Sequence, residues 1–133
     1  MLKAENISKS FIDRSSGKTF ELLHNVSLEI KAGEAVALMG GSGSGKSTLA
    51  RILLSLLPCD CGKIFFQGRD ITNATGKDLS SFRHNVQFIS QRPESFLDPR
   101  QTLGSSLREE FTVFNLPYDE EKIKEILDLV KLN

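Results

Sequence analysis

The spacing of apolar and polar residues in the first part of the chain predicts two β-strands, at 2–7 and 20–30. From residue 26 to residue 30 every second side chain is apolar, which is the pattern of a half-buried antiparallel strand. The residues between the two strands, 13–18, are polar and rich in turn-forming types. The pattern therefore predicts two strands joined by a polar loop.

The middle of the chain changes from strand to helix periodicity. Residues 35–39 are apolar without alternation, which predicts a parallel strand that is covered on both faces. Beyond them, apolar residues recur at the i, i+3, i+4 and i+7 positions of a packed helix, namely Leu49, Ile52, Leu53 and Leu56. Pro58 ends that helix, because proline cannot continue the helical hydrogen bonds.

The second half of the chain carries shorter signals. Strands are predicted at 63–66 and 85–90, and a short helical piece is predicted at 79–83. A helix is predicted from 103 to 111, and another begins after Asp119, a residue type that caps helix N-termini. The apolar stripe of this last helix consists of Ile123, Ile126, Leu127 and Val130.

A glycine-rich segment separates the predicted strand at 35–39 from the helix that follows. It consists of Gly40, Gly41, Ser42, Gly43, Ser44, Gly45, Lys46, Ser47 and Thr48. A turn of the form G-x4-G-K-[S/T] between a strand and a helix predicts a phosphate-binding loop. In such a loop the backbone N–H groups and the helix N-terminus face anionic oxygens. Lys46 is expected to reach the β- and γ-phosphates of a nucleotide, and the Ser47 hydroxyl to bind Mg²⁺.

Composition and charge narrow the class of protein. The 133 residues have the length of one compact domain. Lys and Arg total 17, as do Asp and Glu, so the net charge gives no support for binding to nucleic acid or to an anionic membrane. No apolar run is long enough for a membrane span, and residues 1–5 do not form a signal peptide, so a cytosolic protein is expected.

Four residues of types that often carry chemistry are interpreted as structural. Cys59 and Cys61 do not have C-x-x-C spacing, and no second cysteine pair accompanies them, so reduced thiols in a surface turn are expected. His24 and His84 are interpreted as surface or packing residues.

Several segments outside the glycine-rich one narrow the choice among phosphate-loop proteins. The loop alone fits GTPases, small kinases and motor ATPases as well. Residues 6–11, 23–34, 58–68 and 86–91, together with the G-G-S-G-S-G-K-S-T-L form of the loop, closely resemble the ATP-binding domain of ABC transporters. Residues 95–104 are similar to a loop found in importers of oligopeptides, dipeptides and nickel or nickel-like chelates.

The resemblance implies an α/β fold: a P-loop NTPase core of ABC type with an N-terminal antiparallel β-subdomain and the start of a helical subdomain. Residues 1–90 would form the β-subdomain and core, and residues 91–133 the Q-loop and the start of the helical subdomain. Phe11 would stack on adenine, because an aromatic ring binds a purine face with little hydrogen-bond demand. Gln91 would offer its amide oxygen to Mg²⁺ or to the attacking water, as a second catalytic residue beside Lys46.

The implied cofactors are ATP and Mg²⁺. The implied function is that of the ATP-binding subunit of an importer, which couples ATP hydrolysis to uptake of a small solute such as a peptide or nickel. Its partners would be transmembrane permease subunits and a second ABC ATPase subunit, in a homo- or heterodimer, and not nucleic acid. The chain would then lie at the cytoplasmic face of the plasma membrane.

Two later motifs of the family have no convincing match. A Walker-B strand needs about four apolar residues before an Asp, whereas 96–98 has two and runs into a proline, and 126–128 has helical spacing. No L-S-G-G-Q signature is present. We interpret the 133 residues as the N-terminal part of such a domain, in which residues 35–39 lose cover on one side. Alone, it is expected to bind nucleotide weakly and to hydrolyse it negligibly.

The residues leave two alternative functions open. One is a non-catalytic module that only binds nucleotide. The other is a soluble P-loop kinase or GTPase, a class without the Phe11 platform and the Gln91 loop. A stable preference for GTP, or phosphate transfer to a metabolite, would favour this second alternative.

Overall fold

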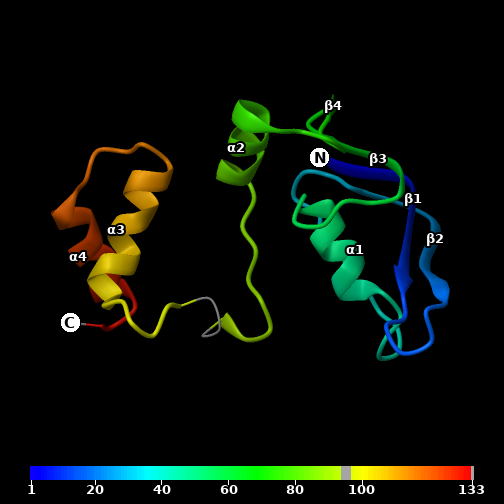
Figure 1. The fold of residues 1–133 in the computed structure, drawn as a ribbon. Helices are drawn as coiled ribbons and strands as arrows, with labels where there is room; N and C mark the ends of the chain where they lie inside the picture. The colour runs from blue at the N-terminus through cyan, green and yellow to red at the C-terminus, as the bar shows by residue number, and fades with distance from the viewer. Residues whose placement is uncertain (94–96, 133) are drawn as a thin grey trace. The chain divides into compact units, whose positions relative to one another are not determined.

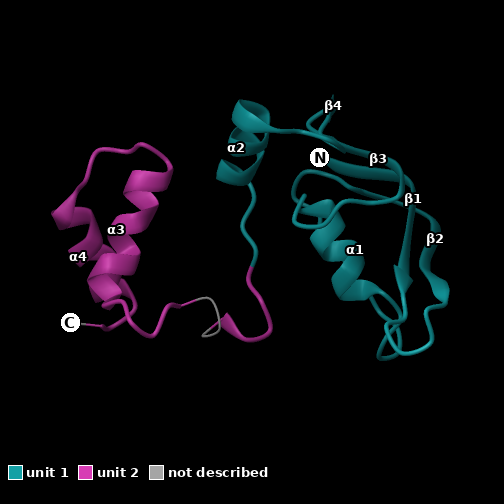
Figure 2. Cartoon of the chain, viewed as in Figure 1, with its two compact units in different colours: residues 1–88 teal, residues 89–133 magenta. Residues whose placement is uncertain are grey.

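The computed structural model describes residues 1–93 and 97–132. The chain forms two compact units, residues 1–88 and the described residues from 89 onward (Figure 2). The first unit contains the β-sheet and the glycine-rich segment, and the second contains the helices nearest the C-terminus.

An antiparallel sheet forms the frame of the first unit (Figure 1). Its strands are β1 (Leu2–Ile12), β2 (Thr19–Ile30), β3 (Cys61–Phe66) and β4 (Arg69–Asp70), in the order β2-β1-β3-β4. Leu2 pairs with Ile30 at one end of the β1–β2 ladder, and Phe11 pairs with Phe20 at the other. The strands predicted at 2–7, 20–30 and 63–66 are confirmed, and each extends further at one end.

Strand β1 is irregular along its length. Its pairing with β2 shifts register between Ala4 and Ile7 and again around Lys9. Two asparagines have left-handed backbone conformations, Asn6 at φ 52° in β1 and Asn25 at φ 51° in β2. Asparagine tolerates this conformation better than most side chains, and bulges of this kind bend a strand without ending it. β1 therefore continues beyond the stretch whose pattern predicts it.

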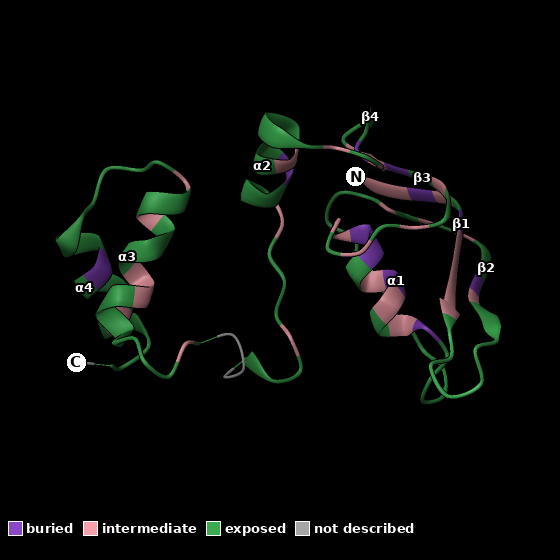
Figure 3. Cartoon of the chain, viewed as in Figure 1, coloured by how far each residue is buried: buried purple, intermediate pink, exposed green. Residues whose placement is uncertain are grey.

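The core of the first unit lies between the sheet and α1 (Lys46–Leu53) (Figure 3). Three residues of the predicted helical stripe are buried, with exposed fractions of 6% for Leu49, 0% for Ile52 and 6% for Leu53. Leu56 is 50% exposed, because the helix ends before it. The buried cluster consists of Ala4, Ile7, Leu23, Leu49, Ile52, Leu53, Ile64, Ile71 and Phe82.

Helix α2 (Gly76–His84) confirms the helical piece predicted at 79–83 and is longer at both ends. Phe82 is 3% exposed and contacts Phe66 of β3 edge-on, with 5.1 Å between the ring centroids. This ring pair joins α2 to the core of the sheet.

Two predicted strands are wrong. Residues 35–39 and 85–90 have no regular secondary structure, and their apolar side chains are exposed at Met39 (90%) and Ile89 (85%). A strand needs a neighbour for its backbone N–H and C=O groups. Within the described residues, the strands pair only with one another, in the order given above. The loss of cover expected for 35–39 is confirmed.

The second unit contains α3 (Leu103–Val113) and α4 (Glu120–Leu129), and both confirm predicted helices. Each begins at a side-chain cap: Thr102 Oγ1 accepts from Ser105 N at 3.2 Å, and Asp119 Oδ1 accepts from Lys122 N at 3.0 Å. The second cap is the one predicted from the pattern. Among the described helices, none combines the length and the apolar composition that would let it cross a membrane.

Candidate functional site

The glycine-rich segment forms a tight loop that leads directly into α1. Ser44 N–H donates to Gly41 O at 3.4 Å, and the first helical bond runs from Leu49 N to Gly45 O at 2.8 Å. Gly45 is buried at φ 89°, and a Cβ built on it would lie 2.7 Å from Cδ2 of Leu23. Only glycine fits this position, because both the backbone angle and the close approach to β2 exclude a side chain. The contact fixes the end of the loop against the sheet.

Lys46 is folded back over the loop that precedes it. Its Nζ donates to Gly40 O at 2.8 Å, to Gly41 O at 2.7 Å and to Ser44 Oγ at 3.3 Å. An ammonium group has three donors, so these contacts use all of them. Binding of a phosphate oxygen by Lys46 therefore requires that at least one contact to the loop is exchanged for the ligand.

The N-terminus of α1 is open to an anion. Its N-cap is Gly45, which has no side chain to accept from the first N–H groups, and the first turn contains no acidic residue. Free N–H groups and the positive end of the helix dipole favour negative charge at this position. Ser47 is exposed and Thr48 is half-buried in the same turn. The loop, Lys46 and this helix end together present N–H and ammonium donors, the groups that suit an anion.

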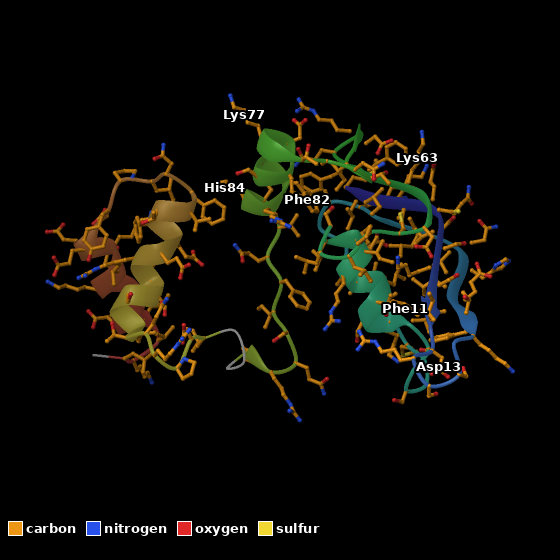
Figure 4. All side chains as sticks on the ribbon, viewed as in Figure 1. Phe11, Asp13, Lys63, Lys77, Phe82 and His84 are labelled. Carbon is orange, nitrogen blue, oxygen red and sulfur yellow. The ribbon has the colours of Figure 1, made fainter. Side chains whose placement is uncertain are left out.

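Phe11 lies near the end of β1, next to the β1–β2 turn that contains Asp13 (Figure 4). Its ring is half-buried, 6.2 Å from the ring of Phe20 between centroids, and Lys9 Nζ lies 5.8 Å from its centroid. Phe11 and the phosphate loop belong to the same unit, and both adjoin β2. The structure thus brings two of the predicted site elements into one body.

Gln91 lies in the second unit and is exposed. Its role, like that of Phe11, stays a prediction. Part of the 95–104 segment, residues 95 and 96, lies outside the described residues. At the end of the 96–98 Walker-B mimic, both oxygens of Asp98 accept from Arg100, at 3.0 and 2.9 Å. These hydrogen bonds and one from the Arg100 backbone lower the pKa of Asp98 below its usual value of 3.8.

An ion pair beside Phe11 is the feature that sequence reasoning missed. Lys9 Nζ donates to Asp60 Oδ1 at 2.6 Å, and Ser10 N–H donates to Asp60 Oδ2 at 2.7 Å. These hydrogen bonds lower the pKa of Asp60. Lys9 and Asp60 are 51 positions apart, so no local pattern could join them. Asp60 is the residue between the two cysteines.

The residues interpreted as structural have ordinary environments. Cys59 and Cys61 are not disulfide-bonded. His24 Nδ1 lies 3.0 Å from Glu21 Oε2 at the surface, and His84 is the last residue of α2. Over residues 1–93 and 97–132, no group of three or more His, Cys, Asp and Glu side chains could hold a metal ion.

The family model described as "ABC transporter" matches residues 23–133. The chain belongs to the ABC transporter family. The resemblance inferred from the residues is confirmed by this match.

Named relatives within the ABC family support the same assignment. A putative peptide import ATP-binding protein of Brucella ovis is 34% identical over 93% of this chain and 38% of its own length. The oligopeptide transport ATP-binding protein OppF of Streptococcus mutans is 34% identical over 100% of this chain and 44% of its own length. This chain therefore spans less than half the length of either relative.

A solved ABC structure has the same fold. The structure described as a dimeric bacterial ABC transporter cassette matches with a TM-score of 0.81 and 28% identity. The match covers 98% of this chain and 56% of the cassette. The fold is therefore of the type found in ABC cassettes.

Proposed function

We propose that the chain binds ATP at residues 40–48, as the ATP-binding subunit of an ABC importer. The observation that carries the proposal is the phosphate loop itself: a glycine turn held against β2, an open helix N-terminus, and an ammonium group within the loop. One of the relatives named above is described as a putative peptide import ATP-binding protein, and the other as an oligopeptide transport ATP-binding protein.

The residues of the loop have distinct roles in this proposal. The backbone N–H groups of Gly41, Ser42, Gly43 and Gly45 surround the β-phosphate, and that of Ser44 exchanges its bond to Gly41 O for a phosphate oxygen. Lys46 exchanges carbonyl contacts for oxygens of the β- and γ-phosphates and neutralises charge on the group that is transferred. Before ATP binds, the carbonyl groups of Gly40 and Gly41 hold the Lys46 ammonium group at the loop. When ATP binds, the ammonium group moves from these carbonyls to the phosphates.

The first turn of α1 also fits a magnesium ion. Mg²⁺ takes oxygen ligands and is commonly bound by one or two protein oxygens together with substrate phosphates and water. Ser47 offers one exposed hydroxyl oxygen in that turn, and phosphate oxygens and water would supply further ligands. When bound, Mg²⁺ supplies positive charge to the phosphate oxygens. Ser47 is the protein ligand in this proposal, with Gln91 as a second.

The base and the partners complete the proposal. Phe11 stacks on the adenine ring, and Gln91 orients the water that attacks the γ-phosphate. A second ABC ATPase subunit and transmembrane permease subunits are the partners, which places the chain at the cytoplasmic side of the membrane. The transported solute is a small molecule, with a peptide as the first candidate because both named relatives are described as peptide transport proteins.

Nucleotide binding without turnover is the second candidate for the 133-residue chain by itself. Its supporting observation is that Asp98 is bonded to Arg100 and that Asp128 lies on α4, so neither mimic places its carboxylate on a strand. The first candidate predicts multiple turnovers of ATP hydrolysis when the partners are present. The second predicts that the chain without its partners binds ATP but does not hydrolyse it.

The test is ATP affinity measured by calorimetry in the presence of Mg²⁺. Lys46→Ala is expected to weaken binding about tenfold or more, because a charge-assisted contact to phosphate is lost. Lys124→Ala, which removes only an exposed 3.5 Å pair with Glu120, is the matched control and should leave the affinity unchanged. Equal affinities for the wild type and Lys46→Ala would contradict the proposal.

A further inference from the structure

A second aromatic ring lies beside Phe11, and the proposed function leaves it without a role. Phe20 is the direct cross-strand partner of Phe11 in the β1–β2 ladder. The two ring centroids are 6.2 Å apart, with the ring planes tilted by 32°. Directly paired residues of an antiparallel ladder place their side chains on the same face of the sheet. Phe20 is 48% exposed, so much of its surface is available to a ligand.

The two rings and the phosphate loop lie along one strand. A Cβ on Gly45 would lie 2.7 Å from Cδ2 of Leu23 and 3.3 Å from Cγ of Leu22, so the loop ends against these two residues of β2. Leu22 and Phe20 are two positions apart on β2, and the β1–β2 register shifts at Leu22. Because a strand rises about 3.3 Å per residue, Phe20 lies about 7 Å along β2 from Leu22. A nucleotide with its phosphates in the loop would extend its base along this part of β2.

Phe11 is restrained on the side of Lys9. The Lys9 side chain is 12% exposed and is fixed by Asp60, 2.6 Å from its Nζ, while the ammonium lies 5.8 Å from the Phe11 centroid. A cation near an aromatic ring attracts it through the ring quadrupole and limits its orientations. The Lys9–Asp60 pair therefore orders Phe11 before ligand binds, and Phe20 is the ring that extends the apolar surface.

We infer that Phe20 is a second base-contacting residue and that the Phe11–Phe20 pair favours purine over pyrimidine nucleotides. The inference rests on the proposed function, because it requires the base to lie at Phe11. A purine has two fused rings and can overlap both phenyl rings, whereas a pyrimidine has one. Phenyl rings offer no hydrogen bonds, so the pair does not distinguish adenine from guanine.

The test compares Phe20→Leu with the wild-type chain for ATP, CTP and inorganic tripolyphosphate, by calorimetry with Mg²⁺. Leucine keeps the residue apolar but removes the aromatic face. Affinity for ATP should fall about three- to tenfold, affinity for CTP should fall less, and affinity for tripolyphosphate should stay unchanged. The ratio of ATP to CTP affinity should therefore move toward one. A loss of folding alone would lower all three affinities together.

The matched control is Tyr118→Leu in the second unit. Tyr118 is also 48% exposed and is also paired with another ring, 5.5 Å from Phe111 between centroids. It should change none of the three affinities. In a Phe20→Leu variant whose thermal unfolding shows it to be folded, equal losses for all three ligands, or an unchanged ATP to CTP ratio, would overturn the inference.

The same measurement separates this inference from the proposed function. If wild-type chain binds neither ATP nor tripolyphosphate, the proposed function fails and the role of Phe20 fails with it. If ATP binds and Phe11→Leu lowers the ATP to CTP ratio but Phe20→Leu does not, only the role of Phe20 is wrong.

Discussion

Helix α1 of the first unit and helix α4 of the second have similar apolar spacing but different surroundings. In α1, Ile52 is completely buried among residues of the sheet. In α4, Ile123 is 9% exposed, whereas Ile126 is 47% and Val130, just after the helix, is 56% exposed. The same sequence pattern thus belongs to a packed helix in one unit and to a partly covered one in the other.

The difference shows what holds each helix. Tertiary burial holds α1, which has no side-chain cap, while α4 depends more on local devices such as the Asp119 cap. The phosphate loop precedes the helix that is packed best. A loop that binds a charged ligand benefits from a fixed base, because the N–H groups are then oriented before the ligand arrives.

The largest effect is expected from truncation of the α1 core. Ile52→Ala should lower the free energy of unfolding by about 2–5 kcal/mol, because it leaves a cavity where the side chain is 0% exposed. Ile126→Ala on α4 should cost less than about 1 kcal/mol, since that side chain is 47% exposed. Urea denaturation measures both values. Equal losses in the two variants would show that α4 is packed as tightly as α1.

Two glycines should respond in opposite directions. Gly45→Ala places a side chain at φ 89° and against Leu23, so stability should fall by at least about 1–2 kcal/mol and ATP binding should weaken. Gly104→Ala, in the first turn of α3, meets no atom within 4 Å and should raise stability by a few tenths to about 1 kcal/mol. Thermal unfolding of both variants tests the signs. If both variants are destabilised, glycine is required at Gly104 as well as at Gly45, and the prediction is wrong.

The cap of α4 should have an effect confined to the second unit. Asp119→Ala removes the acceptor for Lys122 N and should cost about 1 kcal/mol. Asp128→Ala, near the negative end of the same helix, should be neutral or slightly stabilising. Hydrogen exchange of the α4 amides is the measurement. The cap has no such role if Asp119→Ala leaves their exchange unchanged.

The smallest effect concerns two carboxylates with lowered pKa values. Hydrogen bonds from the hydroxyl and N–H of Ser15 and from the Ser16 hydroxyl lower the pKa of Asp13 from 3.8 to about 2. Because the folded-state pKa is below the unfolded value, this stabilisation is complete above about pH 4 and is lost as pH falls through 2. Asp98 has its pKa lowered by Arg100, a charged partner.

Salt should separate these two carboxylates. High ionic strength should raise the titration midpoint of Asp98, whose partner is a screened charge, and leave that of Asp13 almost unchanged. Carboxyl-carbon NMR at low and at 1 M salt, about a tenfold range in Debye length, measures both midpoints. Replacing Ser15 and Ser16 by Ala should return the Asp13 midpoint toward 3.8. If salt shifts the titration midpoint of Asp13 as much as that of Asp98, neutral hydrogen-bond donors are not the cause of the lowered pKa of Asp13.

Local signals predicted much of the fold. The helices at α1 and α4 and the Asp119 cap follow from residues within a few positions of one another, so their sequence patterns were sufficient. The phosphate loop was identified in the same way, because its glycines and Lys46 are contiguous. The sequence also predicted three strands of the antiparallel sheet, β1, β2 and β3, but not β4.

Features that depend on distant residues were not predicted. Apolar content at 35–39 indicated a strand, but a strand also needs a neighbour, and the described strands pair elsewhere. The Lys9–Asp60 pair joins residues that only the fold brings together. The bonds from Lys46 to the carbonyls of Gly40 and Gly41 depend on backbone directions that the residue types do not specify.

The most direct test of the central claim is to map ATP binding on the chain by amide NMR. With ATP and Mg²⁺ added to labelled protein, the largest shift changes should occur at residues 40–48 and at the ends of β1 and β2 near Phe11 and Phe20. The amides of α3 and α4 should change least. Changes concentrated in α3 and α4, or no change at millimolar ATP, would contradict the assignment of the nucleotide site to the phosphate loop.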